Sequence, residues 1–91
     1  MRFRLIAGAD ELRFREIDKE VQTEVAYRES GLARRTTARS AEGEWVVLET
    51  WHSEADADAA ASHRRDQPIY ARFQAMVDQA SVGTDRYMTF D

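Results

Sequence analysis

The sequence contains no cysteine, one proline and one lysine among its 91 residues. The absence of cysteine excludes disulfides, thiolate nucleophiles, iron–sulfur clusters and cysteine-based zinc sites. Long apolar runs are also lacking, and the apolar stretch from Leu5 to Ala7 is too short for a signal peptide or a membrane span. We therefore expect a cytoplasmic protein with no membrane partner, held together by its apolar core alone.

Basic residues are outnumbered, with 13 Lys and Arg against 17 Asp and Glu, and the net charge is −4. A nucleic-acid-binding protein needs a basic surface to displace counterions from phosphates, so this balance predicts no nucleic-acid partner. Hydrophobic residues make up 43% of the chain, which favours a folded protein over a disordered one. The length and the lack of a linker predict one domain over residues 1–91.

Periodicity predicts six elements along the chain, the fifth of which is a helix in two segments. A strand over 2–8 precedes a helix that begins after Asp10 and buries Phe14, Ile17, Val21 and Val25 on one stripe. Two strands follow, over 32–41 and 44–51, joined by a turn at 42–43. Ser53 is predicted to cap an alanine-rich helix over 55–62, and a second helical segment restarts near Pro68 and continues to residue 80. Alternation over 85–90 predicts the last strand.

This order of elements predicts an α+β, ferredoxin-like βαββαβ sandwich with two helices on one face of a four-stranded antiparallel sheet. In the strand over 44–51, Trp45, Val47, Glu49 and Trp51 alternate onto one face. We expect that face to be left uncovered by the helices. Because it is too apolar for water, we also expect it to be buried in a homodimer, as a dimeric α+β barrel.

The stretch from Gly31 to Phe73 resembles the antibiotic biosynthesis monooxygenase family, small proteins of the dimeric α+β barrel type. The matching features are Gly31-Leu32 at the start of a strand, the apolar run from Trp45 to Trp51, and His52-Ser53-Glu54-Ala55 at the start of an acidic, alanine-rich helix. The resemblance implies a cofactor-free oxygenase that acts on a small hydrophobic or aromatic molecule. Many relatives carry a histidine where this chain has Ala60 and Ala61, while His63 lies two or three positions away and so points elsewhere on the helix.

Five residues are candidates for a site. Trp45, Trp51 and Tyr87 are predicted to line a pocket for a flat aromatic ligand, with packing in the core or the dimer as the alternative. Glu49 is predicted to act as a general base; the alternative is a cross-strand ion pair with an arginine at position 34, 35 or 39. His52 is the second acid–base candidate, with a surface role as the alternative. The spacing of the histidines fits no metal site, so no metal is expected.

Two functions follow from these observations. The first is a cofactor-free monooxygenase-like enzyme in which Trp51 positions an aromatic substrate between helices and sheet and Glu49 or His52 transfers the proton. The second is a non-catalytic dimeric module that binds a small ligand or a partner protein, favoured by the alanines at positions 60 and 61.

Overall fold

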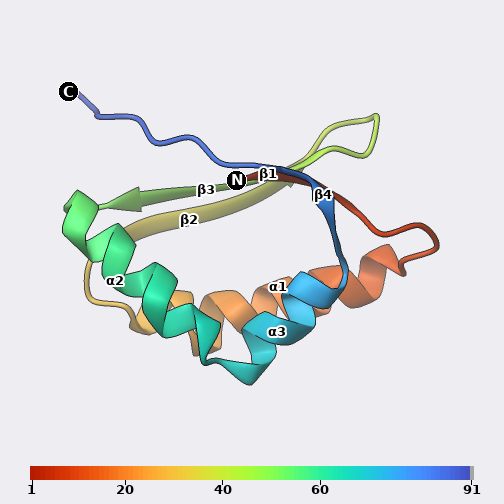
Figure 1. Cartoon of the computed structure of the whole chain (residues 1–91), viewed down its shortest axis with the longest axis horizontal. Coiled ribbons are helices and arrows are strands. Elements are labelled where there is room, and N and C mark those ends of the chain that lie inside the picture. Colours follow the sequence, from red (N-terminus) through yellow and green to blue (C-terminus); the bar gives the residue numbers. More distant parts are fainter. Residues whose placement is uncertain (91) are drawn as a thin grey trace.

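A computed structural model describes residues 1–90 as one sheet covered on one side by helices (Figure 1). The elements are β1 (Arg2–Leu5), α1 (Glu11–Glu24), the 3₁₀ turn η1 (Ala26–Arg28), β2 (Leu32–Arg39), β3 (Trp45–Trp51), α2 (Glu54–Arg65), α3 (Pro68–Ala75) and β4 (Val77–Gly83). The four strands are antiparallel to their neighbours, in the order β2-β3-β1-β4. This order confirms the predicted α+β class and is compatible with a ferredoxin-like fold.

The apolar stripe of α1 forms the centre of the core. Asp10 caps the helix by accepting hydrogen bonds from the amides of Leu12 and Arg13, as predicted. Phe14 is fully buried at the centre of an aromatic cluster, where its ring lies 5.8 Å from that of Phe3, 4.9 Å from Trp45 and 5.2 Å from Phe73. These edge-to-face and tilted contacts fasten α1 and α3 to the sheet.

The predicted orientation of β3 is wrong. Trp45 and Val47 are each only 6% exposed, because their face of the sheet is the one that the helices cover. The alternation of β3 is as expected, but both faces carry apolar residues, so the sequence pattern does not say which face the helices take. The contact of Trp45 with Phe14 decides it.

The open face of the sheet is more polar than expected. Arg2 pairs with Val46, and Thr36 with Leu48, and paired residues of neighbouring strands point to the same side. Leu48 is 64% exposed there, and Arg2, Arg4 and Arg34 point outward from the same face, with Asp78 paired to Arg4. The open face is therefore a mixed surface, with one large exposed apolar side chain from β3.

The C-terminal third departs from the predicted elements. The spacing of Phe73, Met76, Val77 and Ala80 fits a helix, yet α3 ends at Ala75 and β4 begins at Val77. Val77 pairs with Leu5 of β1 and is 2% exposed, so sheet pairing and burial override the helical periodicity. Residues 85–90, predicted as the last strand, have no regular structure and run past the end of β1 (Figure 1).

Candidate ligand pocket and its ion-pair chain

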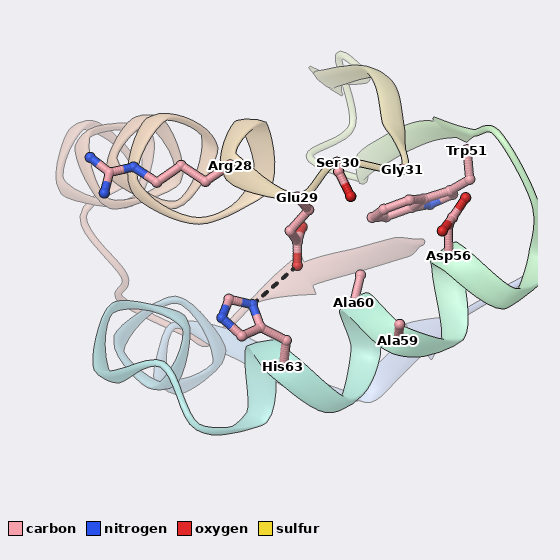
Figure 2. Close-up of a pocket in the computed structure, with 9 residues that line it drawn as sticks. All are labelled: Arg28, Glu29, Ser30, Gly31, Trp51, Asp56, Ala59, Ala60 and His63. Carbon is pink, nitrogen blue, oxygen red and sulfur yellow. Dashed lines mark hydrogen bonds and ion pairs between the residues drawn. The ribbon is translucent and has the colours of Figure 1, made fainter.

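A cavity of about 290 Å³ lies between the loop that follows η1, the end of β3 and one side of α2 (Figure 2). Its walls are one aromatic ring, two carboxylates, one imidazole and several small residues. The lining residues are Arg28, Glu29, Ser30, Gly31, Trp51, Asp56, Ala59, Ala60 and His63. The cavity is on the helix-covered side of the sheet, next to the last residue of β3.

Small residues and a helix cap create this space. Ser53 caps α2 by accepting a hydrogen bond from the Asp56 amide at 3.1 Å, and the Ser53 hydroxyl donates to the Asp56 carboxylate at 2.9 Å. The backbone of Gly31 packs directly against the Asp56 side chain, and a Cβ at position 31 would overlap it. The amide of His52 donates to the carbonyl of Gly31 at 2.9 Å, which joins the end of β3 to this loop.

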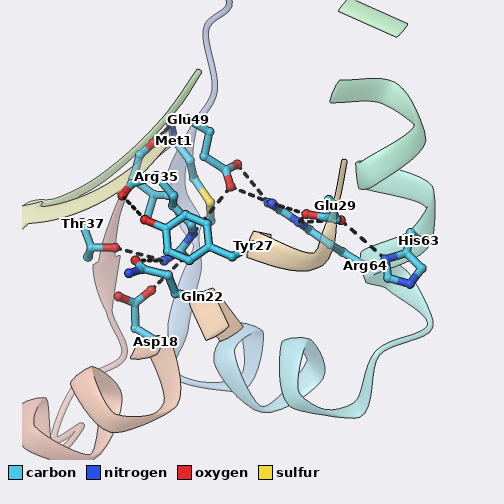
Figure 3. Close-up of polar contacts among 11 residues, drawn as sticks. Met1, Asp18, Gln22, Tyr27, Glu29, Arg35, Thr37, Glu49, His63 and Arg64 are labelled. Atoms are coloured by element: carbon cyan, nitrogen blue, oxygen red, sulfur yellow. Dashed lines mark hydrogen bonds and ion pairs between the residues drawn. The ribbon is translucent and has the colours of Figure 1, made fainter. Parts of the chain in front are cut away.

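A chain of charged side chains crosses the interface between helices and sheet beside the cavity (Figure 3). Arg35 of β2 donates to Asp18 of α1 at 2.8 Å and lies 3.5 Å from Glu49. Arg64 of α2 donates to both oxygens of Glu49, at 2.9 and 2.7 Å, and to Glu29 at 2.7 Å. Asp18, Arg35 and Arg64 are each at most 8% exposed. We call these five residues the ion-pair chain.

The carboxylates hold Arg64 in its charged form. Burial opposes the charge of the guanidinium, but the hydrogen bonds that Arg64 donates to Glu49 and Glu29 outweigh this effect and raise the pKa of Arg64. The same guanidinium lies over the Trp51 ring, 5.3 Å from its centre. Next to Glu49, in the middle of the ion-pair chain, burial lowers the pKa of the Met1 ammonium, against the attraction of Glu49.

His63 reaches the rim of the cavity from the last turns of α2. Its Nδ1 lies 3.5 Å from a Glu29 oxygen, and its Nε2 lies 3.1 Å from the side-chain nitrogen of Gln67. The imidazole is thus oriented by a carboxylate on one side and an amide on the other.

The five predicted site residues do not meet at one place. Trp51 lines the cavity, and Glu49 is part of the ion-pair chain. Trp45 packs in the aromatic core, as the alternative to a pocket role predicted. His52 is exposed just after β3, and Tyr87 is 87% exposed in the C-terminal segment.

The sequence-based reasoning did not place Glu29, Asp56 or His63 at the cavity, nor Arg64 beside it. For Glu49 it named an arginine of the second strand as a partner, and Arg35 is one; Arg64 lies 15 residues further on and was missed. The expectation that His63 points elsewhere on the helix is wrong with respect to Ala60: both line the cavity, because residues three positions apart are neighbours on a helix surface. No local spacing connects Glu29 with Arg64, because 35 residues separate them.

Within residues 1–90, no helix has both the length and the apolar character needed to cross a membrane. The same described part of the chain contains no cluster of three or more side chains arranged to hold a metal ion. No protein-family model matches the chain, and no curated protein or solved structure matches it. The interpretation of the site therefore depends on its own geometry.

Proposed function

We propose that this protein is a small-ligand-binding module whose cavity beside Trp51 takes a small aromatic molecule. The observation that carries the proposal is the combination of one indole wall with a neighbouring surface of small residues. Gly31, Ala59 and Ala60 leave room next to the ring, and polar groups at either end can orient a ligand. An aromatic wall with a few polar groups suits a flat molecule.

The state of Glu49 favours binding over catalysis by that residue. Both of its oxygens accept hydrogen bonds from Arg64, and Arg35 adds a second positive neighbour. Both oxygens are thus taken up by internal arginines, and Glu49 is not among the residues that line the cavity. Glu49 therefore serves to position Arg64 behind the Trp51 ring.

A monooxygenase-like activity is the second candidate, and one observation favours it. His63 lines the cavity, with Glu29 beside its Nδ1 and Gln67 beside its Nε2. An imidazole oriented in this way can accept a proton from a phenolic substrate once Gln67 moves aside. In this scheme His63, and not Glu49 or His52, is the base.

Fluorescence and oxygen uptake separate the two candidates. The Trp45→Phe variant leaves Trp51 as the single indole, so a change in its emission on adding aromatic compounds reports binding in the cavity. Binding without oxygen consumption supports the module. Oxygen uptake with an anthrone-type phenol that is lost in His63→Ala but kept in the matched control His52→Ala supports the enzyme. A Trp51 signal that no aromatic compound changes contradicts both.

We also propose that two copies associate through the open face of the sheet. Leu48 on that face, and Tyr87, Met88 and Phe90 in the adjoining C-terminal segment, are between 64% and 88% exposed. Apolar side chains this exposed on one chain favour burial against a second copy. Asp85 contacts Arg2 at 2.8 Å, so this segment lies next to the open face.

Light scattering tests the association. A dimer is expected, and it should dissociate in Leu48→Glu but not in Leu12→Glu, a change at an equally exposed residue of α1. Because Arg2, Arg4 and Arg34 of the two copies would approach one another, added salt should strengthen the dimer by screening their repulsion. A monomer at all salt concentrations contradicts the proposal.

A further inference from the structure

We propose that the cavity beside Trp51 selects a cationic ligand: a single aromatic ring carrying a short chain that ends in an ammonium or amidinium group. This inference rests on the proposed binding function and adds the charge and size of the ligand. Three observations carry it: the charges that face the cavity, the balance of charge in the ion-pair chain behind it, and the place that the protein gives to its own Arg64.

The charged groups that face the cavity are mainly acidic. Glu29 and Asp56 contribute carboxylates from the loop after η1 and from α2. Arg28 contributes to the wall, but its guanidinium is turned away (Figure 2) and lies 3.3 Å from Glu24. His63 is the remaining titratable group on the wall. Both Glu29 oxygens already accept hydrogen bonds from Arg64, so Asp56 is the wall carboxylate that is left for a ligand.

The ion-pair chain balances its own charges but does not neutralise Asp56. Its three acids, Asp18, Glu29 and Glu49, are offset by Arg35, Arg64 and the Met1 ammonium, which Glu49 attracts. Asp56 lies outside the chain, and the hydrogen bond to its carboxylate comes from the neutral hydroxyl of Ser53. A ligand cation would give Asp56 a positive partner and would form a charge-assisted hydrogen bond.

Arg64 shows how this environment holds a cation. Its guanidinium lies over one side of the Trp51 ring, 5.3 Å from the centre, and donates to carboxylates on both sides. The cavity offers a ligand the same indole and the same Glu29, with Asp56 as the second carboxylate. Aromatic rings and carboxylates together stabilise a desolvated cation better than either does alone. A ligand cation in the cavity could therefore make the same two kinds of contact that Arg64 makes, with an aromatic ring and with a carboxylate.

The cavity is open to solvent, and its size suits a ligand with one ring. Its volume of about 290 Å³ is at the lower end of the range for ligand pockets. A phenyl ring against Trp51 and Ala60, with a chain of two carbons, would bring an ammonium group toward the carboxylates. A polycyclic molecule would extend into solvent.

Three probes with the same phenylethyl group test the charge preference: phenethylamine, 2-phenylethanol and 3-phenylpropionate. Each is titrated against the Trp45→Phe variant, with Trp51 emission as the readout. We expect phenethylamine to bind at least about tenfold more tightly than the alcohol, and the carboxylate to bind weakest, because a hydrogen bond to a charged group is worth about 1.4 kcal/mol or more. Asp56→Asn should remove most of this preference.

Glu54→Gln is the matched control, because it removes a carboxylate from the same turn of α2 outside the cavity. It should leave the preference for phenethylamine unchanged. Urea unfolding of each variant verifies that Asp56→Asn is folded. If the alcohol or the carboxylate binds as tightly as the amine, or if Asp56→Asn keeps the preference in a folded protein, the cation proposal is overturned while the binding function stands. If none of the three probes binds, the proposed function itself fails.

Discussion

The interface between helices and sheet has two halves of opposite character. One half is the aromatic cluster of Phe3, Phe14, Trp45 and Phe73, which is almost entirely buried and contains no polar atom that needs a partner except the indole N–H. The other half is the ion-pair chain, in which the arginines are buried as deeply but every charge depends on a neighbour. The first half accounts for stability, and the second, next to the cavity, defines the candidate site.

The largest effect is expected in the aromatic half. Phe14→Ala should lower the free energy of unfolding by about 3–5 kcal/mol, because the ring contacts three other aromatic side chains and the cavity left behind cannot collapse fully. Urea unfolding followed by circular dichroism measures it. Leu12→Ala on the same helix is the control; Leu12 is 67% exposed, so its loss should cost within about 0.5 kcal/mol. Equal losses would mean that α1 does not pack as described.

The next largest effect is expected in the ion-pair chain. Arg64→Met keeps the bulk of the side chain but leaves Glu29 and Glu49 without their main partner, which should cost about 3 kcal/mol. Adding Glu49→Gln in that background should cost less than it does in the parent protein, with a coupling of about 0.5–3 kcal/mol in a double-mutant cycle. Additive losses would show that the two residues do not interact.

A steric change at the cavity should have a smaller effect. Gly31→Ala places a Cβ against the Asp56 side chain, and the overpacking should cost about 1–3 kcal/mol in the free energy of unfolding. Gly83→Ala is the matched control, since its new Cβ would meet only the flexible end of Arg2, at 3.1 Å. If both glycines tolerate alanine equally, the loop does not pack against α2 as closely as described.

The smallest effect is expected for an ion pair outside the buried chain. Glu11 accepts two hydrogen bonds from Arg39 at 2.7 Å, yet both side chains are more than 40% exposed. Glu11→Gln should therefore cost less than about 1 kcal/mol, and the loss should shrink further in high salt. A cost comparable to that of Arg64→Met would remove the distinction between exposed and buried pairs.

Local sequence patterns predicted an element correctly where they fitted only one type of secondary structure. Asp10 and the four-residue apolar stripe indicated α1, Ser53 indicated the start of α2, and Pro68 indicated the start of α3. The pattern failed after Phe73, because the same apolar residues fit a helix and a buried strand. The strand conformation of Val77 depends on its pairing with Leu5, which lies 72 positions earlier in the chain. The candidate site was partly predicted, since Trp51 and an arginine partner for Glu49 were named, but the residues around them were not.

The sequence by itself determined the alternation of β3, the caps of the helices and the order of elements, because each depends on residues within a few positions of one another. The tertiary structure alone decided which face of β3 the helices cover, where α3 gives way to β4, and which residues surround Trp51. Those outcomes depend on contacts between distant segments. Glu29 and Glu49, for example, both contact the buried guanidinium of Arg64, where their hydrogen bonds offset its desolvation.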